Sequence, residues 1–196
     1  MTRFDAPDPT PSPGGSRRRF LRFAFFGAIG TSFVGAAGMV LQFLMPRSED
    51  ALREFYVDVG TIGDYPLGGP PLGWSTDGRD EARPALWVVN LDPAETRPGG
   101  SGGGEGLIAF SPKCPHLGCT LRWLPSFKFE NDLGWFRCDC HGGTHTKAGV
   151  RVFGPAPRSM DTMRVEIDRR GNVRVHIREI RPGGNDNPKR AVKPPA

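Results

Sequence analysis

Apolar residues follow two different patterns along this chain. From Phe23 to Met45 there are 23 consecutive residues without a charge. At a rise of about 1.5 Å per residue, a helix of that length spans the roughly 30 Å hydrocarbon core of a membrane. We therefore predict one transmembrane anchor over residues 23–45.

Beyond the anchor, short runs of alternating or continuous apolar residues are separated by turn-forming residues. Eight such runs predict β-strands, at 55–59, 86–91, 107–110, 120–124, 134–138, 150–153, 163–168 and 173–178. The stretch Arg169-Arg170-Gly171-Asn172 predicts a hairpin turn between the last two. The fold class predicted is all-β, an antiparallel domain over residues 54–182 that follows one N-terminal transmembrane helix.

Four segments have the composition of flexible chain. Residues 1–22 are rich in proline, glycine and arginine, and we predict a disordered cytoplasmic tail. The short charged segment 46–53 links anchor and domain, and either a rigid helix or a flexible neck fits it. The stretch PGGSGGGEG at 98–106 predicts a flexible loop. Residues 183–196 predict a second disordered tail.

The residues before the anchor indicate the compartment. The stretch Ser16-Arg17-Arg18-Arg19-Phe20-Leu21-Arg22 resembles a twin-arginine export signal, with Arg17 and Arg18 as the arginine pair. The alternative is a positively charged cytoplasmic flank, which needs only the arginines. Both interpretations place the N-terminus in the cytoplasm and the β domain on the periplasmic side. We expect an uncleaved anchor, because cleavage after Ala37 would leave an apolar run of only about a dozen residues.

The net charge of +5 is concentrated near the two ends of the chain. A nucleic-acid-binding domain carries its basic residues on a folded face. The composition therefore argues against nucleic acid as a partner.

Two short boxes hold all four cysteines and two of the four histidines: CPHLGC at 114–119 and CDCHGG at 138–143. Read as metal ligands, Cys114, His116, Cys138 and His141 offer two thiolates and two imidazoles. A structural zinc site accepts such a set. Zinc leaves Cys119 and Cys140 over, one in each box, and in an oxidising compartment such a pair can form a disulfide.

The boxes resemble those of Rieske iron–sulfur proteins, in the form C-x-H-x-G-C and C-x-C-H-G. The resemblance implies a Rieske-type [2Fe–2S] cluster with Cys114 and Cys138 on one iron and His116 and His141 on the other. It also implies a disulfide between Cys119 and Cys140, as in the subunits of cytochrome bc and bf complexes. The export signal agrees, because a cluster assembled in the cytoplasm must cross the membrane inside a folded domain, whereas zinc can bind after unfolded export.

The same resemblance assigns further roles. It implies a cluster-binding subdomain over 111–157, inserted into the β domain, and a flexible neck at 46–53. The stretch Phe153-Gly154-Pro155-Ala156-Pro157 resembles the loop that covers the cluster, although a proline-rigidified turn is the alternative. Residues expected to cover the cluster or to dock a partner are Leu117, Gly118, Gly142, Gly143, Gly154, Pro155 and Pro157. His145 and His176 are expected to have no functional role.

The function implied is that of the electron-transfer subunit of a quinol–cytochrome c oxidoreductase. The subunit would lie in a bacterial cytoplasmic membrane as a single-pass protein. Its partners would be a cytochrome b subunit, a c-type cytochrome and quinol, with His141 as the residue that hydrogen-bonds the quinol hydroxyl. The alternative is the Rieske small subunit of an exported molybdenum oxidase of the arsenite-oxidase type. A free-standing Rieske ferredoxin is disfavoured, because the spare cysteines have no role there.

The second box departs from the ubiquinol-oxidising pattern. Gly143 and His145 stand where that pattern has a serine and a tyrosine that donate hydrogen bonds to sulfur, and Asp139 replaces a proline. Loss of such donors destabilises the reduced cluster and lowers its potential. We therefore expect menaquinol, a stronger reductant than ubiquinol, as the substrate.

Overall fold

The computed structural model describes residues 14–44 and 55–195, which belong to two separate compact units. The first contains helix α1 (Gly14–Leu44). Within it, Gly15–Gln42 is long and apolar enough, by length and composition, to cross a membrane. The predicted neck at 46–53 lies outside the described residues.

Helix α1 begins earlier than predicted, at Gly14 instead of Phe23. The arginine cluster, including Arg17 and Arg18, therefore lies in the helix and is exposed. The prediction of a disordered tail over 1–22 is wrong from Gly14 onward, while residues 1–13 lie outside the described part of the chain. Arginine is a good helix former, so a charged flank extends an apolar helix readily.

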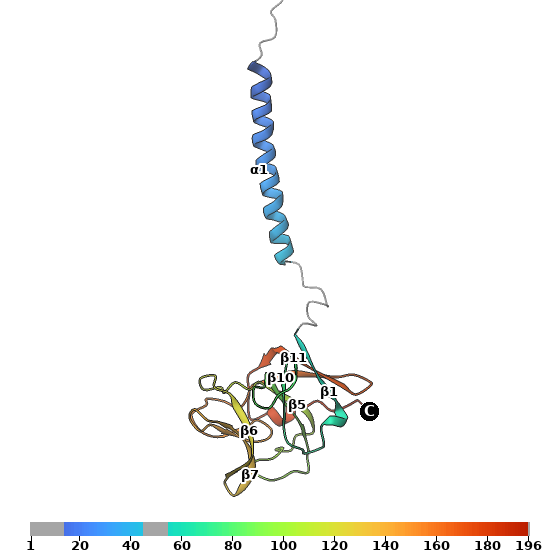
Figure 1. The fold of residues 1–196 in the computed structure, drawn as a ribbon, viewed down its shortest axis with the longest axis vertical. Helices are drawn as coiled ribbons and strands as arrows, with labels where there is room; N and C mark the ends of the chain where they lie inside the picture. Colours follow the sequence, from blue (N-terminus) through green and yellow to red (C-terminus); the bar gives the residue numbers. More distant parts are fainter. Residues whose placement is uncertain (1–13, 45–54, 196) are drawn as a thin grey trace, which may run out of the picture. The chain divides into compact units, whose positions relative to one another are not determined.

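The second unit is built on two antiparallel sheets (Figure 1). The larger has the strand order β1 (Tyr56–Thr61), β11 (Asn172–Arg181), β10 (Thr162–Ile167), β5 (Gly106–Phe110), β4 (Leu86–Leu91), β2 (Leu72–Ser75) and β3 (Gly78–Arg79). The smaller has the order β6 (Leu121–Phe129), β7 (Asp132–Cys138), β8 (Thr144–His145) and β9 (Arg151–Phe153). Two 3₁₀ turns, η1 (Ile62–Asp64) and η2 (Asn187–Arg190), complete the unit. The predicted all-β class is confirmed.

Each of the eight predicted runs overlaps a strand. The sequence analysis missed β2, β3 and β8, which contain only two to four residues. Such short strands have no room for a visible alternation of apolar and polar residues. The predicted hairpin turn is confirmed, since β10 and β11 pair and Gly171, with φ of +82°, donates its N–H to the Asp168 carbonyl.

The smaller sheet is an insertion between two paired strands. Phe110 in β5 lies opposite Thr162 in β10, so the chain leaves and re-enters the larger sheet at one place. The four strands β6–β9 lie between these two points in the sequence. In Figure 1 the yellow β6 and β7 lie to one side of β10 and β11. The four strands therefore form a small sheet inserted into the larger one, and its binding of a cluster stays a prediction.

Aromatic side chains join the two sheets. The indole Nε1–H of Trp87 in β4 donates to the Leu121 carbonyl in β6 at 3.0 Å. The ring of Phe136 in β7 meets those of Trp87 and Phe110 edge-on, at centroid distances of 5.6 and 6.0 Å. Edge-to-face packing adds to the free energy of burying these large rings. The insertion is thus held firmly against the larger sheet.

The glycine-rich segment 98–106 is packed, and the prediction of a flexible loop is wrong. Ser101 is fully buried and donates its hydroxyl to Glu95. A Cβ on Gly104 would lie 2.8 Å from the carbonyl oxygen of Pro188, and one on Gly106 would collide with the Val192 carbonyl. The glycines here permit close backbone approach, which is a use of glycine distinct from flexibility.

The partner of that segment is the C-terminal end of the chain, so the prediction of a disordered tail is wrong for the described residues 183–195. Leu107 and Val192 exchange two backbone hydrogen bonds of 2.9 and 2.7 Å. Asn187 is fully buried and donates its amide to the Met160 carbonyl at 2.9 Å. Two segments of low sequence complexity therefore order each other.

Candidate metal centre

The first box, 114–119, forms a tight loop after β5. The N–H of Cys114 donates to the Cys119 carbonyl at 2.7 Å, and the N–H of Gly118 donates to the Cys114 carbonyl at 2.9 Å. Gly118 has a φ of +80°, a left-handed conformation that glycine adopts without steric penalty. These hydrogen bonds bring the two cysteines of the box to the base of the loop.

The second box, 138–143, repeats the same hydrogen-bond pattern after β7. The N–H of Cys138 donates to the Gly143 carbonyl at 2.8 Å, and the N–H of Gly142 donates to the Cys138 carbonyl at 2.9 Å. Gly142 has a φ of +72°. The two boxes are thus built alike, each with a cysteine at its first position.

The expected ligands form two pairs that differ in burial. Cys114 and Cys138 are buried and are the free cysteines of the chain. His141 is exposed and His116 is half-buried. The centroids of the two imidazole rings lie 4.7 Å apart, with an interplanar angle of 83°. The site therefore offers two thiols on the inside and two imidazoles toward the surface.

Burial raises the pKa of the Cys114 thiol, and the neighbouring Cys138 raises it further. A sulfur in this surrounding is protonated at neutral pH. A bound metal cation reverses this preference and deprotonates a coordinating thiol. Cys114 is therefore suited to hold metal as a thiolate, with its proton released on loading.

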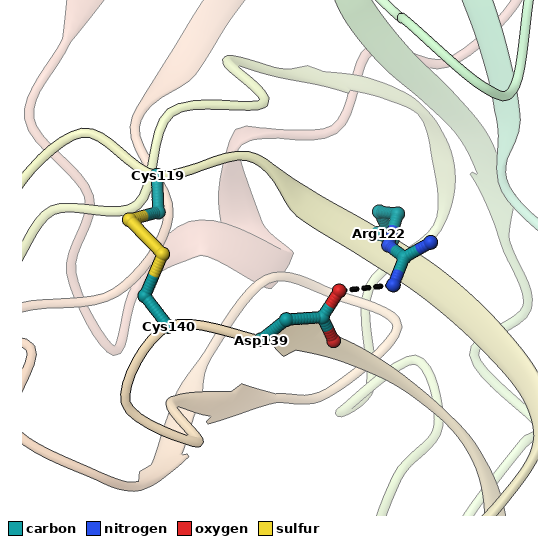
Figure 2. The surroundings of a disulfide bond; sticks show 4 residues. All are labelled: Cys119, Arg122, Asp139 and Cys140. Atoms are coloured by element: carbon teal, nitrogen blue, oxygen red, sulfur yellow. Dashed lines mark hydrogen bonds and ion pairs between the residues drawn. A yellow bond between two sulfur atoms is a disulfide. The ribbon is translucent and has the colours of Figure 1, made fainter.

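A disulfide between Cys119 and Cys140 joins the two boxes (Figure 2). The sulfurs of Cys119, Cys138 and Cys140 all lie within 4.8 Å of one another. Two of these three are bonded to each other, so they are not available as thiolate ligands. The disulfide expected from the Rieske resemblance is present, and it leaves Cys114 and Cys138 free.

Asp139, which replaces a proline of the ubiquinol-oxidising pattern, forms an ion pair with Arg122 on β6 (Figure 2). Both side chains are 50% exposed. An exposed pair of this kind contributes at most about 1 kcal/mol. The ion pair therefore adds a weak link between β6 and the second box, beside the disulfide that joins the two boxes.

The segment 153–157 packs on the second box. Gly154 has a φ of +98°, and a Cβ placed on it would lie 2.6 Å from the Cα of Gly143. The side chain of Arg151 holds this segment by donating from Nη1 to the Ala156 carbonyl at 2.8 Å. Pro155 and Pro157 face solvent. Leu117, in the first box, is 73% exposed.

His145, for which the sequence analysis expected no functional role, has an unusual environment. The side chain is fully buried in β8, and neither ring nitrogen has a hydrogen-bond partner among the described residues. Burial lowers its pKa to about 4; the nearby Arg158 backbone opposes this shift and the charge of Arg151 adds to it. The imidazole is therefore neutral at physiological pH and has one N–H to donate.

The position of His145 fits a bound cluster. The place that a Cβ would take on Gly143 lies 3.9 Å from Cε1 of His145 and 3.9 Å from Sγ of Cys114. Buried N–H groups without a partner are rare in folded proteins. The sulfur atoms of a [2Fe–2S] cluster could accept a hydrogen bond from such a donor. The orphaned imidazole, the two free thiols and the two outer imidazoles together suit such a group.

Comparison with known proteins agrees with this geometry. The family model of the Rieske [2Fe-2S] domain matches residues 73–164. The cytochrome b6-f complex iron-sulfur subunit of Prochlorococcus marinus (strain MIT 9215) is 31% identical over 170 residues, which cover 86% of this chain and 87% of that protein. This chain belongs to the Rieske [2Fe–2S] protein family, whose cofactor is the Rieske cluster.

Further relatives carry the same description. The cytochrome b6-f complex iron-sulfur subunit of Synechococcus sp. (strain RCC307) is 28% identical over 172 residues, with 86% of this chain and 87% of that protein covered. Among solved structures, the plasma membrane Rieske protein of the cyanobacterium Synechocystis PCC 6803 is 27% identical, with a TM-score of 0.39. That match covers 61% of this chain and 97% of the other.

Proposed function

We propose that this chain is the electron-transfer subunit of a membrane-bound quinol–cytochrome c oxidoreductase, with a cytochrome b subunit and a c-type cytochrome as partners. Three observations support the proposal: the Rieske family membership, relatives described as cytochrome b6-f iron–sulfur subunits, and one apolar helix of membrane-spanning length. The observation that carries it is the contrast in exposure between the expected ligands, since the Cys114 and Cys138 thiols are buried and His141 is exposed.

The ligand set assigned to the cluster is Cys114 and Cys138 for one iron and His116 and His141 for the other. When bound, the cluster supplies a one-electron acceptor whose histidine ligands become more basic on reduction. An imidazole that binds iron through one ring nitrogen keeps the other for a hydrogen bond. Because the His141 ring is exposed, that second nitrogen is open to a hydroxyl group from outside the domain.

In this proposal the His141 ring nitrogen that does not bind iron, when it is deprotonated, accepts the hydrogen bond of a quinol hydroxyl held by the cytochrome b subunit. That nitrogen would take the hydroxyl proton, while one electron would pass from the quinol to the cluster. Leu117, exposed beside His116, adds an apolar contact to the same docking surface. The disulfide and the packed segment 153–157 keep the two loops from separating. A flexible neck at 46–53 would then let the domain move between donor and acceptor.

The substrate class is inferred from the second box. Gly143 has no side chain to donate a hydrogen bond toward sulfur, which lowers the potential of the bound cluster. His145 retains one N–H at the position of the other missing donor, so the loss is partial. We propose menaquinol as the substrate on this ground. A cluster potential in the range of ubiquinol-oxidising relatives would contradict this part of the proposal.

The location proposed is a bacterial cytoplasmic membrane, with the N-terminus inside and the β domain on the periplasmic face. Arg17 and Arg18 would form the twin-arginine export signal. Export in the folded state suits a domain in which both cluster loops and the C-terminal segment are packed together. Replacement of both arginines by lysine should leave the protein on the cytoplasmic side, as scored by protease accessibility of spheroplasts.

The alternative, a small subunit of an exported molybdenum oxidase, shares the boxes and the export signal. It predicts a soluble protein cleaved near Ala37 and associated with a large catalytic subunit. The test is to purify the full chain from membranes of its source through a C-terminal affinity tag. Co-purification of b-type haem together with menaquinol-dependent reduction of cytochrome c supports the quinol proposal, whereas a soluble complex with molybdenum supports the alternative.

A further inference from the structure

Two arginines lie directly opposite each other in the hairpin that carries the second box. Arg122 in β6 pairs with Arg137 in β7, one residue before Cys138. Like charges directly opposite in an antiparallel sheet are destabilising. The contacts of each guanidinium group show how the structure tolerates this pairing.

The two side chains have different surroundings. Arg122 forms an ion pair with Asp139, which balances its charge (Figure 2). Arg137 has no ion-pair partner within the described parts of the chain, residues 14–44 and 55–195. Its guanidinium carbon lies instead 4.2 Å from the centroid of the Phe127 ring. The Arg137 charge is thus positioned by a cation–π contact, which does not neutralise it.

The same guanidinium lies against the second box. A Cβ placed on Gly142 would be 3.5 Å from Nη2 of Arg137, and Gly142 directly follows His141. Arg137 is partly buried, whereas Arg122 is exposed. A charge that is partly shielded from water and salt acts over a longer range than one in open solvent. The loop that carries Cys138 and His141 therefore has an uncompensated positive charge beside it.

We propose that Arg137 is a positioning residue that raises the reduction potential of the bound cluster. Reduction adds one electron, and so one negative charge, to the group held between the two boxes. A fixed guanidinium beside the loop stabilises this charge more than it stabilises the oxidised state. An ion pair between Arg137 and a carboxylate would cancel the effect, which explains why an aromatic ring holds the side chain. The inference concerns the cluster and does not rest on quinol as the substrate.

The test is a redox titration of the full-length, cluster-loaded protein in detergent, followed by the electron paramagnetic resonance signal of the reduced cluster. Arg137→Gln should lower the midpoint potential, and Arg137→Lys, which keeps the charge, should restore most of it. Lys128→Gln is the matched control, because exposed Lys128 lies at the far end of the same hairpin, opposite Leu133. This control removes one positive charge from the same strand pair and should leave the midpoint unchanged.

A second variant guards against loss of the cluster in Arg137→Gln. Phe127→Leu removes the ring that holds the guanidinium. It should also lower the midpoint potential, by a smaller amount than Arg137→Gln does. Raising the ionic strength should reduce the difference between wild type and Arg137→Gln. An unchanged midpoint potential in Arg137→Gln would overturn the proposal. If Arg137→Gln retains no cluster, an unchanged midpoint potential in Phe127→Leu would overturn it instead. So would equal shifts in Arg137→Gln and Lys128→Gln. Because the titration uses no quinol, none of these outcomes depends on the proposed function.

Discussion

Gly154 and Gly143 are in direct backbone contact, with only 2.6 Å between the Cα of Gly143 and the place of a Cβ on Gly154. The contact joins the segment 153–157 to the last residue of the second box. It is short enough that any side chain at position 154 must displace one of the two backbones.

Gly154→Ala should therefore loosen the cover over the second box and lower the amount of cluster retained. The strain of a positive φ alone costs about 1–2 kcal/mol for a residue with a Cβ, and the collision with Gly143 adds to it. Gly103→Ala is the control, because Gly103 has a φ of +75° but nothing lies within 4 Å of the place that its Cβ would take. Measuring iron content and thermal unfolding of both variants separates the effect of backbone strain from that of the collision with Gly143. Equal losses of iron and of thermal stability in the two variants would contradict a role for the contact between Gly154 and Gly143.

Gly143→Ser should raise the cluster potential. A Cβ at this position meets Cys138 at 3.6 Å and Cys114 at 3.9 Å, which are ordinary contact distances, so the side chain fits. A net hydrogen bond of about 1 kcal/mol to the reduced state corresponds to a shift on the order of 40 mV for one electron, since tenfold equals about 59 mV. Gly143→Ala adds the Cβ without the hydroxyl and should leave the potential unchanged. If both variants shift it equally, the donor explanation fails.

The Cys119–Cys140 disulfide should contribute far more to the free energy of unfolding than the nearby ion pair between Arg122 and Asp139. It closes a loop with a sequence separation of 21, which predicts a stabilisation of about 3 kcal/mol. The double replacement Cys119→Ser and Cys140→Ser should lower the free energy of unfolding by that amount in denaturant titrations. Arg122→Gln with Asp139→Asn should lower it by less than about 1 kcal/mol. A larger effect of the ion pair would show that it has a structural role of its own.

Lys147 should contribute to the free energy of unfolding at neutral pH through its ion pair with Glu95. Its buried Nζ lies 2.7 Å from Glu95 Oε1. Burial opposes ionisation of Glu95, but hydrogen bonds from Lys147, Ser101 and Arg97 outweigh it and lower the pKa. Lys147→Met should lower the free energy of unfolding at pH 7 by about 3 kcal/mol, whereas Arg79→Met, in an exposed pair with Glu81, should change it by less than about 1 kcal/mol.

The difference in free energy of unfolding between wild type and Lys147→Met should depend on pH in one direction. A carboxylate with a lowered folded-state pKa stabilises the fold above its unfolded value, near 4.5 for Glu95, and the contribution is lost as the pH falls through the lowered value. The gap between wild type and Lys147→Met should therefore narrow on acidification below pH 4.5. A gap that stays constant from about pH 7 to about pH 3 would exclude the buried ion pair as its source.

The C-terminal segment should stabilise the domain through Asn187. Asn187→Ala removes the hydrogen bond to the Met160 carbonyl and leaves that buried oxygen unpaired, which costs about 1–3 kcal/mol. Lys189→Ala, two residues away and exposed, should change the free energy of unfolding little. The measurement is the thermal unfolding temperature of the two variants. If both unfold close to the wild-type temperature, the packing of this segment does not contribute to stability.

Local signals in the chain were sufficient to predict the apolar helix, the β class and the Rieske [2Fe–2S] cofactor. Long apolar runs and two-residue alternation involve neighbouring residues alone, so most strands could be predicted within a few residues. The two boxes carried the family resemblance because ligand spacing within a tight loop is also local. Predictions of this kind need no knowledge of distant contacts.

The order of the segments that look disordered depends on tertiary contacts instead. Residues 98–106 and 183–195 lack local preference, yet Gly106 and Val192 fit together because the glycine has no side chain in the way. His145 and Arg137 acquire their importance in the same manner. Among the described residues, the His145 ring nitrogens have no hydrogen-bond partner, and the Arg137 guanidinium lies against the Phe127 ring instead of a carboxylate. Burial and pairing depend on all the surrounding elements at once, and no short stretch of sequence encodes them.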